Sequence, residues 1–458
     1  MPGFPTTKLR PPRAPATAIA RPRLEALLDA ARETLRATLL VAPAGYGKTT
    51  LVSTWLRRRR GAVAWFALDP GDDDGHDPDP ERLVAGWLGA ALASAGAWDG
   101  GAALTTGHRG EAPPDGGAVR AAPAEPRALA AALEASGWRG VVVLDDAHHL
   151  SEGAAAGLAN WVERAPDGVH TLVLARQSPP LPIARWLARG EAELLGPDAL
   201  RLDPVEGRAL VAALLPQLEQ AHADMLVTRV EGWPAGVQLA ARSLRGKADP
   251  VDLIERFTGT DRYVLAFLTE EVLLRLPDDL HEAALLLAGE ARLCSGLVSA
   301  LTGRPDGAAV LARLEAHETF LERLDSSDDE GPWFRFPDFF RDLLSHRLAL
   351  SHPDLPPQLA ARAATWWHHR TQRPSAATAT TPGTAPGAAA ATPIADELTE
   401  RERQVLTLLA AGASTKTIAR RLGLSPNTIK THTRHVFEKL GVRNRTEAAA
   451  RARELHLL

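Results

Sequence analysis

A glycine-bearing turn at residues 42–50, APAGYGKTT, contains the residue types of a phosphate-binding loop. Gly45 and Gly47 allow backbone N–H groups to curl around phosphate oxygens, and a helix that starts after them adds the positive end of its dipole. Lys48 is placed to reach the β- and γ-phosphates, and the hydroxyl of Thr49 to ligate Mg²⁺. The turn predicts a site for ATP or ADP with Mg²⁺, contacted by Ala44, Gly45, Tyr46, Gly47, Lys48, Thr49 and Thr50.

The residues on either side of the turn have the pattern that a P-loop requires. The apolar run TLLVAP (38–43) suits a buried parallel strand, and KTTLVSTWLRRRR (48–60) has helical spacing with cations at its end. Ala42 stands where the simplest motif has its first glycine, and alanine is small enough for that position. Strand, loop and helix in this order favour a P-loop over the alternative, a glycine-rich turn with a chance lysine.

A second strand ends in carboxylates. GVVVLDDAHHL (140–150) is an apolar run that ends in Asp145 and Asp146, the Walker B pattern that holds Mg²⁺ beside a P-loop. Asp145 is predicted to share the Mg²⁺ with the P-loop hydroxyl, and Asp146 is the candidate catalytic base. His148 and His149 follow on a segment that we expect to be extended, where neighbouring side chains point opposite ways. This favours a solvated or capping role for the two histidines over a metal site.

A third strand pattern, VHTLVLARQ (169–177), ends in Arg176. At the end of a strand beside a P-loop, Arg176 is placed to sense the γ-phosphate of ATP, and an ordinary surface arginine is the alternative. With VAWFALD (63–69), these strands predict a parallel α/β sheet whose carboxyl ends gather the polar groups.

Composition and pattern divide the rest of the chain. Residues 371–395, TQRPSAATATTPGTAPGAAAATPIA, have the composition of an Ala/Thr/Pro linker. Residues 311–348 have the pattern helix, hairpin, helix, which suits a winged helix. The expected fold is an α/β P-loop NTPase domain, then helical and winged-helix units, then an all-α helix-turn-helix domain. The expected domains are 1–203 (P-loop domain, with a partly flexible loop at 70–126), 204–268 (helical), 269–350 (winged-helix-like), 351–370 (a short helical remnant), 371–395 (linker) and 396–458 (DNA-binding).

The C-terminal segment has the capping pattern of several short helices. A capping box starts a first helix at about 400–411, whose core face carries Val405. A second helix covers 416–422, and Ser425 caps a third. A last helix, 445–458, carries small alanine side chains on one side, which suit a dimer contact. Helices of this length and order are typical of a helix-turn-helix domain.

The third of these helices has two distinct faces. Val436 and Leu440 share the apolar face with Ile429, whereas Lys430 and Arg434 lie on a polar stripe that suits the major groove of DNA. A solvated face in an ordinary three-helix cluster is the alternative. The candidate DNA contacts are Lys416, Ser425, Asn427, Thr428, Lys430, Thr431, Arg434, His435 and Lys439.

Charge and cysteine content narrow the class of protein. Residues 397–458 carry 12 Lys and Arg against 6 Asp and Glu, a net +6, and residues 1–396 carry 40 against 50, a net −10. A basic segment on an acidic body predicts a nucleic-acid partner for the C-terminal part only. The single cysteine, Cys294, excludes an internal disulfide framework. The N-terminus lacks a signal-peptide core, and no apolar run approaches the roughly 20 residues of a membrane span. We therefore expect a cytoplasmic protein without a membrane partner.

Residues 398–458, from LTERERQVL to RELHLL, resemble the LuxR-type helix-turn-helix over their whole length. The rest of the chain resembles the large ATP-binding LuxR regulators, the maltose-regulator type of signal-transduction ATPase. Besides the P-loop, the Walker B pattern and VAWFALD, the matching segments are TKLRPPR (7–13), RPRLEALL (21–28), EGWPAGVQLAA (231–241) and FLERLDSSDDEGPWFRF (320–336).

The resemblance implies a nucleotide switch. ADP would hold the ATPase, helical and winged-helix units closed, and ATP with an inducer would open them, so that the protein oligomerises and activates transcription. It also implies that Pro234 contacts the adenine and that Arg176 is a phosphate sensor. The implied partners are double-stranded promoter or operator DNA, RNA polymerase, and further copies of the chain as a dimer or higher homo-oligomer.

Two features depart from the pattern of this family. Its members usually have a histidine after the aromatic pair of the winged unit, which holds the β-phosphate of ADP, whereas here Pro337 follows WFRF. They also carry a long array of helical repeats that binds inducer, whereas ARAATWWHHR (361–370) resembles only the start of such an array before the linker. The chain thus resembles a family member shortened by loss of its sensor repeats.

The leading hypothesis is an ATP-binding, sequence-specific DNA-binding transcriptional regulator, an activator switched by ADP/ATP exchange and at most a slow regulatory ATPase. One alternative is a P-loop ATPase enzyme or motor that its C-terminal part tethers to DNA, which turnover typical of enzymes would favour. Another is a two-component response regulator, which would need a phosphoacceptor domain where the P-loop lies.

Overall fold

The computed structural model describes residues 4–59, 61–73, 75–97, 125–245, 250–255, 257–317, 319–328, 330–372, 403–407, 433 and 436. The chain divides into two compact units, Met1–Pro374 and Ser375–Leu458. Most described residues lie in the first unit. Among the described helices, none is long and apolar enough to cross a membrane.

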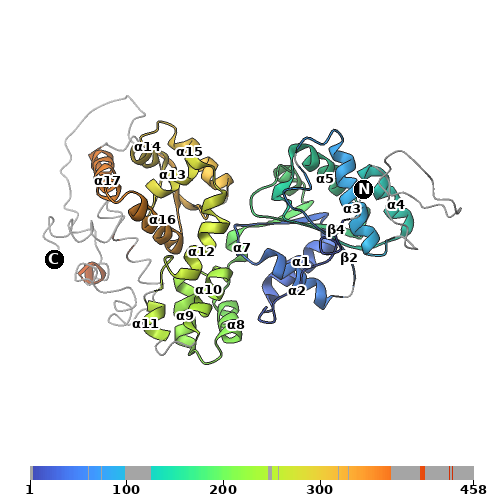
Figure 1. Ribbon diagram of the computed structural model, residues 1–458, viewed down its shortest axis with the longest axis horizontal. Helices are drawn as coiled ribbons and strands as arrows, with labels where there is room; N and C mark the ends of the chain where they lie inside the picture. Colours follow the sequence, from blue (N-terminus) through green and yellow to red (C-terminus); the bar gives the residue numbers. More distant parts are fainter. Residues whose placement is uncertain are drawn as a thin grey trace, which may run out of the picture. The chain divides into compact units, whose positions relative to one another are not determined.

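Five parallel strands form the sheet of the first unit (Figure 1), in the order β2-β3-β4-β1-β5. Val41 lies beside Ala175, and Ala67 beside Asp145, so the strands end together at one edge of the sheet. This confirms the predicted parallel α/β sheet, in which β1, β3 and β4 carry the polar residues of interest at their ends. The strands are β1 (Ala37–Val41), β2 (Ala62–Ala67), β3 (Gly140–Asp145), β4 (Val169–Ala175) and β5 (Ala192–Leu195).

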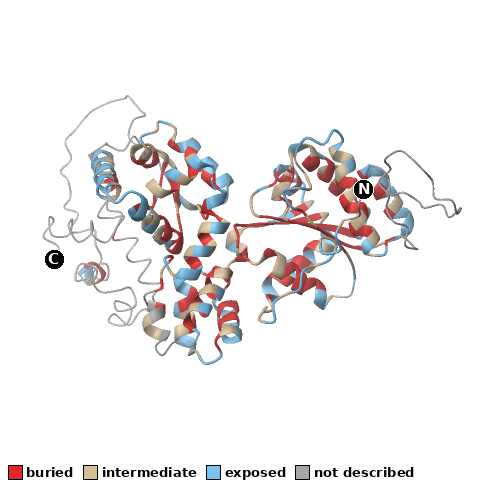
Figure 2. Cartoon of the chain, in the orientation of Figure 1, coloured by how far each residue is buried: buried red, intermediate tan, exposed pale blue. Residues whose placement is uncertain are grey.

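Alternate residues of the strands pack into two cores, one on each face of the sheet (Figure 2). Val141 and Val143 share a core with α1 and α2, whereas Val142 and Leu144 share the other with α3, α4 and α5. Successive side chains of a strand point to opposite faces, so a sheet covered on both faces needs continuous apolar strands. The helices are α1 (Pro22–Thr34), α2 (Lys48–Arg58), α3 (Pro80–Ser94), α4 (Pro126–Ser136) and α5 (Glu152–Arg164).

Capping residues in the sequence set where several helices begin. Asp79 accepts a hydrogen bond from the N–H of Arg82 at the start of α3, and Ser151 accepts from Ala154 at the start of α5. The predicted loop at 70–126 is interrupted by α3, and its residues 74 and 98–124 lie outside the described residues. Three shorter elements complete this part of the chain: η1 (Ala147–His149), α6 (Ile183–Ala188) and α7 (Pro197–Leu200).

A run of helices follows the sheet. Asp203 and Glu206 form a capping box at the start of α8, and the carboxylate of Glu206 also pairs with the buried guanidinium of Arg21 at 2.7 Å. Helix α10 begins at Pro234, within the family-matching segment EGWPAGVQLAA (231–241). The helices are α8 (Pro204–Leu214), α9 (Gln220–Arg229), α10 (Pro234–Leu244), α11 (Pro250–Glu255) and α12 (Arg262–Glu271).

The predicted order helix, hairpin, helix is confirmed by α15, β6, β7 and α16. The hairpin is antiparallel, and Phe334 of β7 also bridges Leu293. Helix α17 continues to Gln372, so its last two residues fall within the segment that was predicted to be a linker from residue 371. The domain boundaries themselves stay predictions. The elements are η2 (Leu273–Arg275), α13 (Asp278–Leu286), α14 (Ser295–Thr302), α15 (Gly307–Ala316), β6 (Glu322–Asp328), β7 (Gly331–Arg335), α16 (Asp338–Ser351) and α17 (Leu355–Gln372).

In the second unit, residues 403–407 are helical, within the range predicted for the first helix of this unit. Val405 and Val436, which the sequence places on core faces, are both fully buried. The rest of the predicted helix-turn-helix lies outside the described residues.

Candidate functional site

The P-loop lies between the end of β1 and the start of α2. Gly45 and Gly47 have φ of 82° and 77°, a left-handed conformation that glycine adopts without strain. The ammonium of Lys48 is buried and donates hydrogen bonds to the carbonyl oxygens of Ala42 at 2.5 Å and Pro43 at 3.1 Å. The loop therefore turns back on the lysine that is predicted to reach phosphate.

Thr49 and Asp145 come together at the end of β3. The hydroxyl of Thr49 donates to a carboxylate oxygen of Asp145 at 3.0 Å. Burial, with the neighbouring charge of Asp146, raises the pKa of Asp145 to about 6. A hydroxyl and a carboxylate are the oxygen donors that Mg²⁺ prefers. These residues therefore fit the Mg²⁺ of a bound nucleotide.

His148 and His149 do not point opposite ways, so that prediction from the sequence is wrong. Asp146 has a left-handed φ of 56°, and the chain then enters the 3₁₀ turn η1 instead of continuing extended. The two imidazole rings consequently lie with their centroids 4.0 Å apart. Among the described residues, no group of three or more His, Cys, Asp or Glu side chains is arranged to hold a metal ion.

His148 is mostly buried, with 9% of its side chain exposed. Burial, with the charge of His149 next, lowers the pKa of His148 to about 3, so its imidazole is neutral at physiological pH. Its Nδ1 atom has no hydrogen-bond partner within the described part of the chain. Buried polar atoms are usually satisfied, so an unpaired one on a pocket wall indicates a place for a polar ligand or water.

Arg176 directly follows β4, and its side chain contacts α12. Its guanidinium donates from Nη1 to the carboxylate of Glu271, at the end of α12, at 2.5 Å. The Nε atom also lies 3.8 Å from a carboxylate oxygen of Asp146. Arg176 is therefore held between the Walker B strand end and α12.

A pocket of about 220 Å³ adjoins Arg176 and the start of the P-loop. Both arginines of its lining, Arg176 and Arg275, contact Glu271. The pocket brings together two P-loop residues, the histidine pair and a face of α12 and η2. Its lining is Pro43, Ala44, His148, His149, Arg176, Gln177, Glu271, Val272, Arg275 and His317.

The segment before α10 packs directly on the P-loop. The indole N–H of Trp233 donates to the carbonyl oxygen of Ala44 at 3.2 Å. The backbone N–H of Ala235 donates to the carbonyl oxygen of Gly45 at 3.0 Å. A Cβ atom at Gly45 would lie 2.6 Å from Cβ of Ala235, so the approach requires glycine. Pro234, the predicted adenine contact, is buried at the first position of α10. Trp233 lies directly before Pro234 in the sequence but is not among the site residues predicted from it.

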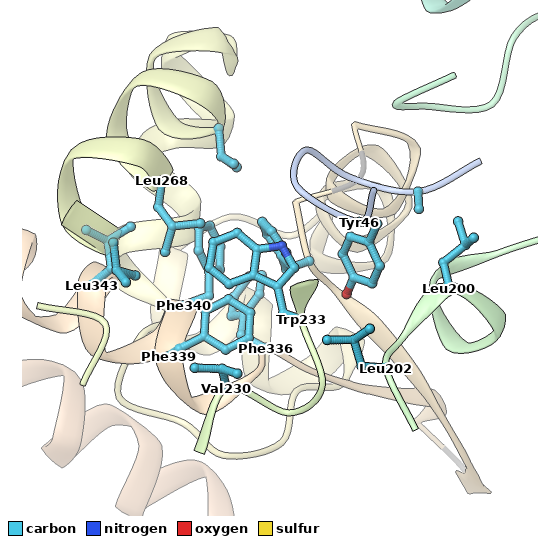
Figure 3. Close-up of a cluster of buried hydrophobic side chains, with 14 of the residues drawn as sticks. Tyr46, Leu200, Leu202, Val230, Trp233, Leu268, Phe336, Phe339, Phe340 and Leu343 are labelled. Atoms are coloured by element: carbon cyan, nitrogen blue, oxygen red, sulfur yellow. The ribbon is translucent and has the colours of Figure 1, made fainter. Parts of the chain in front are cut away.

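Trp233 is the centre of an aromatic cluster (Figure 3), in which its ring stacks on Phe339 with centroids 4.9 Å apart and contacts Phe320 edge-on at 5.5 Å. Tyr46 of the P-loop joins the cluster through Phe320, at 6.0 Å. The P-loop is thus packed against residues from the winged-helix part of the chain. We call this set the aromatic cluster: Tyr46, Trp233, Phe267, Phe320, Phe336, Phe339 and Phe340.

Four charged side chains form a second contact, which we call the ionic cluster: Arg201, Glu231, Glu322 and Arg335. Arg335 lies 2.5 Å from Glu231 and 2.7 Å from Glu322, and Arg201 pairs with Glu322 and lies 3.6 Å from Glu231. Burial would raise the pKa of Glu231, but the arginines hold it below its ordinary value. Pro337 is buried one residue before Asp338, whose N–H donates to Glu231.

The candidate DNA contacts at Lys416, Ser425, Asn427, Thr428, Lys430, Thr431, Arg434, His435 and Lys439 lie outside the described residues. Their roles stay predictions.

Comparison with known proteins gives two family matches, both in the second half of the chain. Residues 396–452 match the family described as bacterial regulatory proteins, luxR family, and residues 269–356 match the MalT winged helix domain. Serine/threonine-protein kinase PknK of Mycobacterium tuberculosis (strain CDC 1551 / Oshkosh) is 31% identical over 381 residues, which are 80% of this chain and 32% of PknK. HTH-type transcriptional regulator MalT of Cronobacter sakazakii is 30% identical over 372 residues, 80% of this chain and 39% of MalT. The chain therefore spans well under half the length of either relative.

One solved structure, a Walker-type ATPase of Pyrococcus abyssi, is 14% identical, with a TM-score of 0.49 over 73% of this chain and 98% of that chain.

Proposed function

We propose that this chain is an ATP-binding, sequence-specific transcriptional regulator, because its residues 396–452 match the luxR family of bacterial regulatory proteins and residues 269–356 match the MalT winged helix domain. The observation that carries the proposal is that one chain combines a LuxR-type domain with a P-loop whose Thr49 hydroxyl contacts the carboxylate of Asp145. The first implies a DNA partner, and the second fits a nucleotide with Mg²⁺.

The P-loop residues divide the work of holding a nucleotide. The backbone N–H groups around Gly45 and Gly47 bind phosphate oxygens, and the ammonium of Lys48 exchanges its carbonyl partners for phosphate. Thr49 and Asp145 hold the Mg²⁺, which neutralises charge on the phosphates. Because the pKa of Asp145 lies near 6, its carboxylate is mostly ionised at neutral pH, and protons compete with the cation for it only at about pH 6 and below.

Exchange of ADP for ATP then switches the protein between a closed and an open form, and the open form oligomerises on DNA and activates transcription. The contacts of the aromatic and ionic clusters support a closed form in which the P-loop is packed on the winged-helix part. Pro337 stands where related regulators have a histidine for ADP, so ADP holds this closed form less firmly. RNA polymerase is the further partner of an activator.

The test measures DNA binding of the full chain on selected duplexes with ATP, with ADP and without nucleotide, while calorimetry measures nucleotide binding. Lys48→Ala should abolish nucleotide binding and make DNA binding independent of nucleotide, because its charge meets phosphate and not DNA. Lys430→Ala with Arg434→Ala should weaken specific DNA binding and leave nucleotide binding intact, because these side chains are predicted to read bases.

Unchanged nucleotide affinity in Lys48→Ala would remove the P-loop assignment. Unchanged sequence preference in the double variant would remove the third helix as the DNA reader. ATP turnover at rates typical of enzymes, about 1–1000 per second, would favour the alternative of an ATPase tethered to DNA.

A further inference from the structure

An ion pair between Arg176 and Glu271 joins the end of the central sheet to α12. Nη1 of Arg176 lies 2.5 Å from Oε2 of Glu271, and each of these side chains is 29% exposed. The residues are 95 positions apart in sequence. The contact therefore reports on how the helical part of the chain sits against the nucleotide-binding sheet.

Glu271 is ionised in this arrangement. Burial acts to raise the pKa of Glu271, but the charges and hydrogen bonds of Arg176 and Arg275 hold it below its ordinary value. Arg275, one turn further along the chain, donates to the same carboxylate at 3.1 Å. Glu271 therefore occupies both guanidinium groups of the pocket with a single anionic group.

The same pocket lies beside the loop that is proposed to hold phosphate. It lies against Pro43 and Ala44 at the start of the P-loop, on the side of the Walker B strand end. One wall carries the unpaired, mostly buried Nδ1 of the neutral His148. A phosphate group that entered here would find Arg176 within the pocket but already paired with a carboxylate.

From this geometry we propose that Glu271 competes with the γ-phosphate of ATP for Arg176, and so sets how strongly the protein prefers ADP to ATP. The inference rests on the proposed function, because it assumes that the P-loop holds a nucleotide. ADP ends at the β-phosphate and leaves the pair between Arg176 and Glu271 intact. ATP gains Arg176 only when Glu271 gives it up, which frees the end of α12 from the sheet.

This competition couples nucleotide identity to the position of α12. A ligand shifts a two-state equilibrium only by its differential affinity for the two states. Here the differential contact is the guanidinium of Arg176, which pairs with Glu271 in one state and with phosphate in the other. Glu271 is thus a specificity-determining residue that acts through Arg176 without touching the nucleotide.

The experiment compares Glu271→Gln with Glu270→Gln in the full chain. Glu270 is exposed and lies on the same helix, so its substitution removes the same charge from the same element without touching the pocket. Calorimetry measures the affinities of both variants and the wild type for ATP and for ADP, each with Mg²⁺. Glu271→Gln should bind ATP about fivefold or more tightly than wild type, within the range of typical coupling free energies, and ADP within about twofold. Glu270→Gln should match wild type for both nucleotides.

A double-mutant cycle with Arg176→Ala separates this role from general loss of charge. On the Arg176→Ala background, Glu271→Gln should no longer change ATP affinity, because the guanidinium for which Glu271 and the γ-phosphate compete is absent. Limited proteolysis gives a readout independent of affinity: cleavage around 245–262, next to α12, should rise with ATP but not with ADP in the wild type, and should rise without nucleotide in Glu271→Gln.

Equal tightening of ATP and ADP in Glu271→Gln, or equal behaviour of the two glutamine variants, would overturn the competition while leaving nucleotide binding in place. Wild type that binds neither nucleotide would overturn the proposed function and this inference together. If Glu271→Gln lowers the melting temperature too far to measure affinity at 25 °C, Glu271→Asp, which keeps the charge but shortens its reach, should show the same selective gain for ATP in a weaker form, and its absence would count against the proposal.

Discussion

The aromatic cluster and the ionic cluster join the same pieces of chain by opposite means. Glu231 and Trp233 are two residues apart, and so are Glu322 and Phe320, yet the first of each pair belongs to the ionic cluster and the second to the aromatic one. The aromatic side chains are almost fully buried except for Phe267, which is half-buried, whereas those of the ionic cluster are 17–30% exposed.

The difference indicates how a nucleotide can act on this structure. Contacts between aromatic rings contain no anionic group that a phosphate could displace. The aromatic cluster is therefore expected to fix the shape of the structure around the P-loop. Ion pairs that are partly exposed can exchange one anion for another, as is proposed for Arg176 and Glu271. A nucleotide switch is therefore expected to act first on the charged contacts. The aromatic contacts should stay in place until the winged-helix part separates from the P-loop.

The largest effect is expected from Trp233→Ala, measured as the free energy of unfolding in urea without nucleotide. The indole is 1% exposed and contacts Phe339, Phe320 and Phe267, so its removal should cost about 3–5 kcal/mol. Trp233→Phe keeps a ring in place and should cost less than half as much. A loss below about 1 kcal/mol for Trp233→Ala would mean that the aromatic cluster does not hold these segments together.

A smaller, salt-dependent effect is expected from Glu322→Gln. This removes the charge that pairs with Arg201 and Arg335 and leaves both guanidinium groups partly uncompensated. The cost should be about 1–2 kcal/mol, between the values for exposed and for buried ion pairs.

Salt should distinguish the two clusters. In 1 M NaCl, where charges are screened beyond about 3 Å, the difference between Glu322→Gln and wild type should shrink by about half or more, while that for Trp233→Ala should not. Asp198→Asn is the matched control: Asp198 also lies near Arg201, at 3.8 Å, but is 96% exposed and should cost less than about 0.5 kcal/mol. Equal effects of Glu322→Gln and Asp198→Asn would show that the ionic cluster adds no stability of its own.

Local pattern sufficed to predict the sheet, the loop that carries Lys48, and the strand ends that carry Asp145 and Arg176. Each of these depends on apolar runs and turn residues that are contiguous in sequence. The geometry of His148 and His149 was missed because a single left-handed residue, Asp146, turns the chain into η1. Aspartate tolerates the left-handed conformation, but the neighbouring residues carry no pattern that predicts it.

The residues that pair with the site from distant segments could not be predicted from the sequence, for a different reason. Glu271 meets Arg176 across 95 residues, and the ionic cluster joins residues from three separate segments. Such pairs depend on tertiary packing, and no spacing within one segment encodes them. Trp233 could have been found, because it is a large apolar residue in a motif that was already singled out.

A smaller effect still is expected from Tyr46→Phe, at the residue where the two clusters meet. The ring of Tyr46 contacts Phe320 at 6.0 Å, and its hydroxyl interacts with Arg201 of the ionic cluster. Burial raises the pKa of the Tyr46 phenol, against the charge of Arg201, so the group is neutral and acts only as a hydrogen-bond partner. Tyr46→Phe keeps the ring and deletes that hydroxyl, which should cost about 1 kcal/mol or less without nucleotide. Tyr46→Ala deletes both and should cost about 3 kcal/mol or more, because the side chain is 2% exposed. If the two substitutions cost the same, the hydroxyl contact with Arg201 holds the P-loop tyrosine and its ring does not, which would reverse the order proposed for the two clusters.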